Sequence, residues 1–437
     1  EHRFTGDAPE LMGGARAQYN SQDLSRIARV WGATGYKNFS ISAGVTTAEY
    51  GSRQLAEPGQ SPDGQGTFPL ALAERVNDTA YRSRGIDLKA IFTLSDDDEL
   101  MFSLQNFDLP GLPRYNETVS GYGTANGGRQ AVAVSIYRND RSFYHLRYRH
   151  SAPLAFMDSL ELHLGHQLIN DNRLDRERDL SRDTFEFNQS ALTGFTAQAR
   201  SQHGVHGLLY GVELYSDRVN SRSVRETPPG SGSQVGNSAS GFQSRFPNGA
   251  RADDYGVYLS DEWQIASDWL LDIGGRYSYH QTDLPLADRA LAASAGDSDV
   301  TGNLALRYAI TPALAWTLNA GRGFRAPNIN DLAQVGRRSG GRVVVANLDL
   351  KPESVSSLDT GLKFSGGGWS GEAGIFYSDY QDRITLVNNA VAEGSGGCPD
   401  DGDAVAEPCA QNRNIAKARY YGFEGGIRTL MAGWLTL

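Results

Sequence analysis

Apolar and polar residues alternate one by one along many segments of the chain. In residues 271–280, one face of an extended strand would carry Leu271, Ile273, Gly275, Tyr277 and Tyr279, and the other Asp272, Gly274, Arg276, Ser278 and His280. The same pattern recurs in 185–200 and 421–429. A one-sided antiparallel sheet shows such alternation, and so does a barrel with a lipid-facing exterior and a wet lumen. The pattern therefore predicts an all-β chain.

The connections between these segments alternate in length. Short turns are predicted at Gly35–Asn38, Asp96–Glu99, His203–His206, Ala266–Asp268, Thr311–Ala313 and Gly366–Gly368. Long polar loops are predicted at Glu57–Asn77, Pro110–Arg129, Thr227–Ala252, Asp283–Asp299, Asn328–Pro352 and Asn388–Asn414. Outer-membrane barrels have short turns on one rim and long loops on the other, and soluble sandwiches rarely sustain this over 400 residues.

The fold class predicted is a transmembrane antiparallel β-barrel with about 16–17 strands in this chain. The first strand lies near Gly14–Asn20, and if it starts at the periplasmic rim, odd strands run outward. A last strand begins at Gly433 and the chain stops at Leu437, inside it. An open edge in lipid leaves backbone groups unpaired, so we expect further strands outside this sequence.

Composition agrees with this prediction. The 437 residues contain 50 Gly and 20 Tyr, and no stretch approaches the roughly 20 apolar residues of a spanning helix. The net charge of −10 argues against nucleic acid as a partner. The two cysteines, Cys398 and Cys409, flank a short acidic segment, and a disulfide-closed loop is favoured over two free thiols or a metal site.

Two segments carry a specific resemblance. The first is Gly321–Leu332, which contains Phe324, Arg325, Ala326 and Pro327. The second is Val343–Glu353, which contains Asn347, Leu350, Pro352 and Glu353. Together they resemble the paired boxes that bracket one extracellular loop in TonB-dependent receptors. The segments 256–263, 375–384 and 414–425 resemble neighbouring strands of that family in the same order.

This resemblance implies a barrel of 22 strands closed by an N-terminal plug, with energy supplied by a TonB-type protein in the periplasm. We therefore expect residues 1–437 to be one partial barrel domain that lacks the plug and the last strands. The expected location is the outer membrane of a Gram-negative bacterium. Expected partners are outer-membrane lipid and lipopolysaccharide, the coupling protein through the absent plug, and a small ligand such as an iron complex.

The loop between the two boxes bears on the ligand. Haem receptors of this family place a His between the boxes, and no His or Tyr lies between Pro327 and Asn347 here. The loop instead carries Arg337, Arg338 and Arg342, whose guanidinium groups suit carboxylates or phosphates. An anionic ferric siderophore or haem propionates could use them; alternatively they contact lipopolysaccharide phosphates or are solvated.

Other candidate residues have simpler explanations. Arg325 is predicted to face the lumen, where an ion pair at the loop base is favoured over ligand contact. Tyr115 and Tyr122 lie in a long loop, where they could stack on a planar ligand or pack within the loop. His203 and His206 offer two ligands in one turn, and His163 and His166 are predicted to face opposite sides of a strand.

Three functions from different classes remain. The leading hypothesis is an energy-coupled importer of a scarce nutrient, with an iron complex such as a ferric siderophore or haem as the favoured ligand. The alternatives are a passive porin-like channel and a soluble or surface β-protein that binds glycans. No cofactor or metal site is predicted, and no catalytic signature such as Gly-x-Ser-x-Gly or His-Glu-x-x-His occurs in the sequence, so an enzyme is not expected.

Overall fold

The structure is a computed structural model of the 437-residue chain. It describes residues 4, 6–53, 79–114, 132–177, 182–230, 233–235, 244–286, 291–337, 343–392, 398, 409–415, 417–431 and 435–436. Within these ranges, no helix is both long and apolar enough to cross a membrane.

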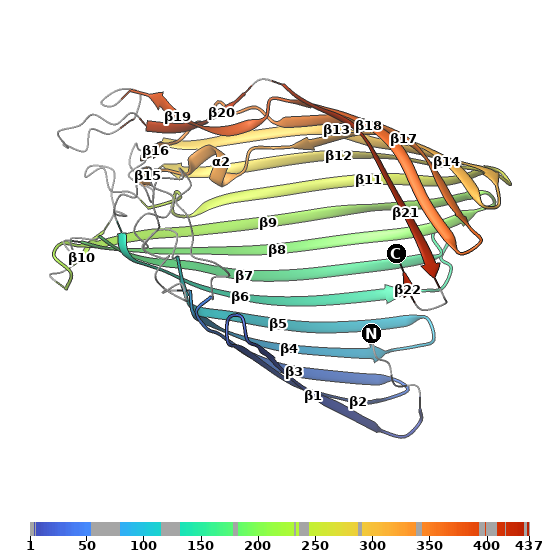
Figure 1. Ribbon diagram of the computed structural model, residues 1–437, viewed down its shortest axis with the longest axis horizontal. Coiled ribbons are helices and arrows are strands. Elements are labelled where there is room, and N and C mark those ends of the chain that lie inside the picture. Colours follow the sequence, from blue (N-terminus) through green and yellow to red (C-terminus); the bar gives the residue numbers. More distant parts are fainter. Residues whose placement is uncertain are drawn as a thin grey trace.

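An 18-stranded antiparallel sheet forms a curved wall (Figure 1). Its first nine strands are β1 (Glu10–Asn20), β2 (Ser25–Tyr36), β3 (Phe39–Tyr50), β4 (Tyr81–Thr93), β5 (Asp98–Pro113), β6 (Val132–His150), β7 (Ser159–Glu177), β8 (Asp183–His203) and β9 (His206–Glu226). The next seven long strands are β11 (Ala250–Ala266), β12 (Trp269–Leu286), β13 (Leu291–Thr311), β14 (Leu314–Arg325), β17 (Glu353–Gly366), β18 (Trp369–Gln381) and β21 (Ala418–Met431). Two short strands, β10 (Ser233–Val235) and β22 (Leu435–Thr436), complete the sheet.

Each long strand pairs with the next long strand in the chain, as the alternation of turns and loops predicted. For example, β9 pairs with β11 and β14 pairs with β17. Among the described residues, β1 pairs with β2, and β21 pairs with β18 and β22, so these two outermost strands do not pair with each other. The predicted all-β antiparallel architecture is confirmed, and the wall is open in this structure.

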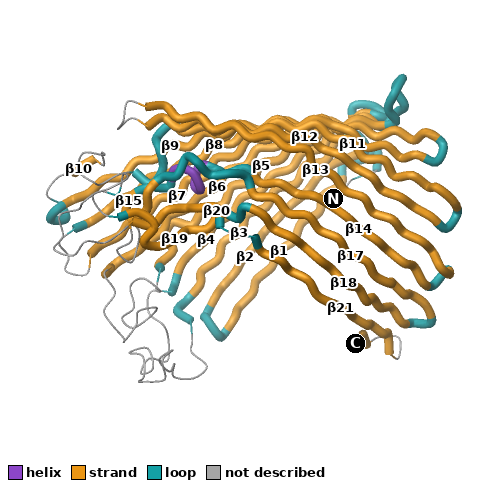
Figure 2. Tube along the Cα trace, turned by 90° about the horizontal axis from the view of Figure 1, so that it is seen from above, coloured by secondary structure: helices purple, strands orange, loops and turns teal. Residues whose placement is uncertain are grey.

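The two rims of the wall differ, which confirms the predicted asymmetry. All six predicted short turns lie on one rim; in the turn after β17, Gly367 and Gly368 both have positive φ (62° and 82°), as a two-residue hairpin of type I′ requires. The opposite rim carries the long connections, together with α2 (Ile329–Ala333) and the small strands β15 (Gly336–Arg337), β16 (Val343–Val345), β19 (Ile384–Val391) and β20 (Cys409–Asn414) (Figures 1 and 2). Odd-numbered β1 runs from the short-turn rim to the loop rim, as expected.

The prediction of a long loop at Asp283–Asp299 is wrong. β12 continues to Leu286 and β13 begins at Leu291, and the two strands pair throughout this region. The segment was predicted as a polar loop, and its many small residues have low strand propensity. In the folded protein these small residues have a role, because Ala293 and Ala295 pack against the cluster that contains α2.

The outward face of the wall is apolar. Tyr421, Phe423 and Ile427 of β21 have exposed fractions of 74–78%, and Ile273 and Tyr277 of β12 are also exposed. Such a continuous apolar exterior is unfavourable in water and favourable in lipid. The alternation seen in the sequence therefore separates lipid-facing from lumen-facing residues.

The inward face is polar, and several of its charged residues form ion pairs. Arg29 contacts Asp87 at 2.6 Å, Arg147 contacts Glu99 at 2.8 Å, and Arg276 contacts Glu213 at 2.8 Å. Each pair joins different strands of the wall.

Aromatic residues bound the apolar band at both rims. Toward the short turns, Trp269 stacks on Tyr308 with ring centroids 4.4 Å apart, and Trp263 is exposed. Toward the loops, Tyr255 and Tyr279 lie in register on β11 and β12. Aromatic girdles of this kind mark the two lipid–water interfaces of an outer-membrane barrel. Leu259 lies midway between Tyr255 and Trp263 on β11.

The face assignment predicts the effect of a charge at Leu259. Leu259→Arg places a guanidinium near the middle of the apolar band and should lower the free energy of unfolding in lipid vesicles by about 2–4 kcal/mol. Ser260→Arg, one residue along and facing the lumen, should cost clearly less. Denaturant unfolding of both variants in the same vesicles measures the difference, and equal losses would contradict the assignment.

Candidate functional site

The first box connects the end of β14 to α2. Asn328 is the N-cap of this helix: its side chain accepts a hydrogen bond from Asp331 N (2.9 Å), and the Asp331 carboxylate accepts one from Asn328 N (3.1 Å). This reciprocal capping box satisfies amide groups that a helix start leaves unpaired. The chain thus turns into a helix directly after Pro327, which is fully buried.

Arg325 joins the two boxes. Its Nε donates to Glu353 Oε2 at 2.7 Å, and its Nη1 donates to Asp331 Oδ2 at 2.6 Å. The other oxygen of Glu353 accepts a hydrogen bond from the backbone amide of Ile384, at the start of β19. An ion pair at the loop base, which the sequence favoured for Arg325, is therefore present, and its guanidinium is engaged on two sides.

α2 packs against the lumen side of the wall. Its buried residues Ile329, Leu332 and Ala333 contact Leu284 of β12 and Ala250 of β11, together with Leu350 of the second box. Leu284 lies on the same face of β12 as Arg276, whose ion pair with Glu213 crosses the lumen side. The loop after β14 therefore folds inward over the barrel mouth. Full burial of a side chain such as Leu332 contributes about 1.5–3 kcal/mol.

The second box holds the returning chain in place. Asn347 Nδ2 donates to the carbonyl of Asn412 at 2.8 Å, and Asn347 Oδ1 accepts from the amide of Asp349. The Asn347 amide also donates to the carbonyl of Leu332, the last turn of α2. Leu348, which stands where the family pattern has Pro, is 39% exposed.

The loops after β14 and β18 form one folded unit. Strands β15, β16, β20 and β19 make a four-stranded sheet, in which β16 and β20 run parallel and Val344 lies opposite Ala410. Side-chain amides add further links, since Asn412 donates to the Asp331 carbonyl (2.8 Å) and Asn414 to the Lys351 carbonyl (2.9 Å). We call the described residues of 326–352 and 382–415 the loop unit.

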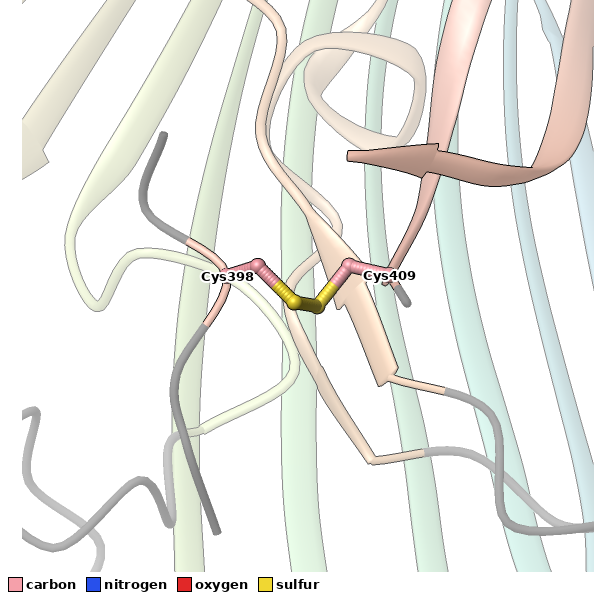
Figure 3. The surroundings of a disulfide bond; sticks show 2 residues. All are labelled: Cys398 and Cys409. Atoms are coloured by element: carbon pink, nitrogen blue, oxygen red, sulfur yellow. A yellow bond between two sulfur atoms is a disulfide. The ribbon is translucent and has the colours of Figure 1, made fainter. Parts of the chain in front are cut away.

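A disulfide between Cys398 and Cys409 lies at the start of β20 (Figure 3). Both cysteines are buried against Val343 and Val345 of β16, and Val391 packs on the same cluster. The disulfide thus belongs to the contact between the two loops.

The other predicted site residues are distributed as follows. Phe324 lines a cavity of about 350 Å³ beside Arg325, together with Asp254, Arg276, His280 and Asn328. The backbone of Arg337 lies in β15. Arg338, Arg342, Tyr115 and Tyr122 lie outside the described residues.

The sequence reasoning missed several residues of this site. Asn412 and Asn414 tie the loops together, and the only signal for them was their place in a segment that resembles the family. His280 was assigned to the polar face of its strand, but its partners were not predicted: Nδ1 contacts Asp254 (2.6 Å) and Nε2 contacts Thr282 (2.8 Å).

The histidines of the described regions do not form a metal site. In these regions no group of three or more His, Cys, Asp or Glu side chains is arranged to hold a metal ion. His163 faces the lumen and contacts His145 of β6, with the two nitrogens 3.0 Å apart, while His166 contacts Thr193 instead. His206 contacts Asp261 at 2.7 Å.

The Arg325 contacts predict a selective loosening of the loop unit. Arg325→Gln removes both ion pairs, and because Arg325 is 44% exposed we expect a loss of about 1–2 kcal/mol. Hydrogen exchange in α2 and at the start of β19 should accelerate about tenfold. Arg322→Gln is the matched control, since Arg322 is also 44% exposed and pairs with Asp299 on the wall. Equal acceleration in α2 in both variants would refute the role given to Arg325.

The disulfide predicts coupling between the two loops. Replacing both cysteines with serine (Cys398→Ser and Cys409→Ser) should lower the stability of the loop unit by about 2–4 kcal/mol, because the unfolded loop gains freedom. Hydrogen exchange should accelerate in β16 and α2 as well as in β20, although β16 and α2 belong to the other loop. Acceleration restricted to the loop after β18 would show that the two loops open independently.

Comparisons with known proteins agree with this architecture. The family model "TonB dependent receptor-like, beta-barrel" matches residues 85–437. The iron-regulated outer membrane virulence protein of Vibrio cholerae serotype O1 is 28% identical over 138 residues, which cover 30% of this chain and 18% of that protein.

Solved structures show the same fold. The copper transporter OprC superposes with a TM-score of 0.73 at 16% identity, covering 99% of this chain and 60% of that one. The Serratia marcescens hemophore receptor HasR, in complex with its hemophore and heme, has a TM-score of 0.70 at 15% identity and covers 97% and 62%. The ferric enterobactin receptor PfeA of Pseudomonas aeruginosa has a TM-score of 0.67 at 16% identity and covers 98% and 62%.

This chain therefore spans about 60% of the length of the solved receptors that it matches. The match to the family model covers most of the chain, and it includes both boxes and the strands that carry them. The chain belongs to the TonB-dependent receptors, which are transporters of the Gram-negative outer membrane, and it carries the β-barrel region of that family.

Proposed function

We propose that residues 1–437 are part of the barrel domain of a receptor that imports an iron complex with energy supplied through a TonB-type protein. The ligand binds at the outer mouth of the barrel, beneath and beside the loop unit. A plug domain and the remaining strands belong to the whole receptor, and the coupling protein acts through that plug. No chemical conversion of the ligand is involved.

The observation that carries this proposal is the inward-folded loop unit. Two loops linked by a mixed sheet, a disulfide and the Arg325 contacts cover a polar lumen lined with paired charges. A receptor that recognises a ligand before releasing it into the lumen requires an ordered structure at that place. A passive channel requires an open mouth, so the porin-like alternative is less consistent with this arrangement.

Iron is supported by a relative of this chain in sequence. The Vibrio cholerae relative is named as an iron-regulated outer membrane protein. The copper, hemophore and ferric enterobactin receptors share the fold at 15–16% identity, which supports the architecture and carries no information about the ligand.

Among iron complexes, we favour an anionic ferric siderophore over haem held by an imidazole of this loop. The segment between the boxes has no His or Tyr that could ligate haem iron. It does carry Arg337, Arg338 and Arg342, which suit carboxylate or other anionic oxygen groups. Arg325 is not part of this set, since its guanidinium already pairs with Asp331 and Glu353.

The arginine set gives the test of this proposal. In the full-length receptor, the combined change Arg337→Gln, Arg338→Gln and Arg342→Gln should weaken binding of an anionic ferric siderophore at least about tenfold. Binding is measured by titration of the purified receptor with ferric siderophores of different charge. Arg413→Gln is the control, because Arg413 lies in the same loop unit and donates to the carbonyl of Ala390.

Two results would contradict the proposal. Equal affinity of the triple variant and the control variant would remove the arginines from the site. Haem binding with an imidazole-ligated spectrum, retained after replacement of every His in the plug, would show that haem is ligated by the barrel.

A further inference from the structure

Three arginines stand on the outward face of the wall beyond the loop-side aromatic girdle. On β9, the outward positions continue from Val212 and Leu214, which are 39% and 42% exposed, to Ser216, Arg218, Asn220 and Arg222. Arg251 of β11 lies directly opposite Arg218. Leu214 is in register with Tyr255, so the arginines lie just outside the apolar band. We call Arg218, Asn220, Arg222 and Arg251 the arginine patch.

Within the described ranges, one of the three arginines of this patch has an ion-pair partner. Arg251 pairs with Asp253 at 2.9 Å. Arg218 forms no ion pair with any residue of the described ranges, and Arg222 lies over the ring of Phe187 at 5.2 Å without a carboxylate partner there. Arg251 is also in register with Asp283 of β12, so the protein supplies carboxylates for Arg251 but, within the described ranges, none for Arg218 or Arg222.

Other arginines of the wall have carboxylate partners. Arg29, Arg147 and Arg276 each have a carboxylate within 2.8 Å. Outward arginines elsewhere can have such a partner too, as in the Arg82–Glu49 pair, so the availability of Arg218 and Arg222 for an external anion rests on their lack of a carboxylate partner within the described ranges.

The arginines are also restricted to one rim. Toward the short turns, the outward positions of β9 are His206, Leu208 and Tyr210. On β8, β9, β11 and β12, the outward arginines are Arg218, Arg222 and Arg251, all on the loop side. In an outer-membrane barrel the loop side meets the outer leaflet, so an anionic group of that leaflet is the natural partner.

We propose that the arginine patch binds the phosphorylated sugar headgroup of a lipopolysaccharide molecule on the outer wall of the barrel. Arg218, which has no carboxylate partner among the described residues, binds one phosphate of the headgroup. Arg222, roughly 13 Å further along the strand, contacts an outer anionic group. Its stacking on Phe187 leaves the guanidinium edge free to donate hydrogen bonds.

The remaining neighbours fit an amphiphilic glycolipid. Asn220 and Gln189 lie opposite each other between the two arginines of β9 and are exposed, so their amides can hydrogen-bond sugar hydroxyls. Below the patch, the exposed Leu214 and Val212 continue into the apolar band and would contact acyl chains. The surface therefore changes in the same order as the lipid, from anionic sugar to hydrocarbon.

The test uses the full-length receptor with the double change Arg218→Gln and Arg222→Gln. Native mass spectrometry counts lipopolysaccharide molecules retained after extraction with detergent and a metal chelator, so that bridging divalent cations do not contribute. Titration with defined lipopolysaccharide should show about tenfold weaker binding for each arginine removed. Wild-type receptor should lose affinity to a similar extent when the lipid A phosphates are removed enzymatically.

Two control variants make the result specific. Arg82→Gln removes another outward and exposed arginine, one that pairs with Glu49 at 3.2 Å, and it should leave binding unchanged. The double change Arg218→Lys and Arg222→Lys keeps the charge and should restore most of the affinity. The proposal would be overturned if the double Gln variant retained as much lipopolysaccharide as Arg82→Gln does. It would also be overturned if the wild-type receptor bound dephosphorylated and phosphorylated lipopolysaccharide with equal affinity. Siderophore binding is measured on the same samples, so failure of this inference is distinguishable from failure of the proposed import function.

Discussion

Backbone hydrogen bonding in a medium without water is the constraint on which the structure depends. In lipid, every amide and carbonyl of a spanning segment has to be satisfied within the protein, and neighbouring strands do this through continuous antiparallel ladders. The ladders in turn fix which residues share a face, because side chains alternate along each strand. Lipid selects apolar residues on one face, and the wet lumen allows charges on the other, as β12 shows with Tyr277 outside and Arg276 inside.

Beyond the apolar band this constraint is relaxed, and other interactions determine the structure. β12 and β13 continue as a paired hairpin above the band, and α2 packs against their lumen side through Leu332 and Leu284. Irregular backbone in the loop unit is satisfied by side-chain amides, chiefly those of Asn347, Asn412 and Asn414. The two boxes of the sequence thus have a structural role, because their polar residues support the loop unit.

The sequence was sufficient for the parts of the fold that depend on local patterns. Alternation identified the strands, and glycine-containing turns such as Gly367–Gly368 were placed correctly. The pairing of 283–286 with 291–294 was missed because the segment was interpreted as a polar loop, whereas Ala293 and Ala295 pack against the cluster that contains α2. The parallel pairing of Val344 with Ala410 could not be predicted, since it joins residues far apart in the chain and depends on where the barrel places the two loops. The pairing of Arg325 with Glu353 could have been predicted from the sequence, because strands β14 and β17 are neighbours and the two residues lie in register.

Arginine has three different roles in this chain, and the groups around each side chain determine which role it has. Inside the lumen, Arg29, Arg147 and Arg276 have carboxylate partners on other strands, and these ion pairs join the strands. At the loop base, Arg325 has two carboxylate partners and holds separate segments together. On the outer face Arg218 and Arg222 have no such partner among the described residues, in a region where the surroundings are lipid headgroups. Whether a carboxylate lies within contact distance therefore distinguishes a structural arginine from one available to bind a molecule outside the protein.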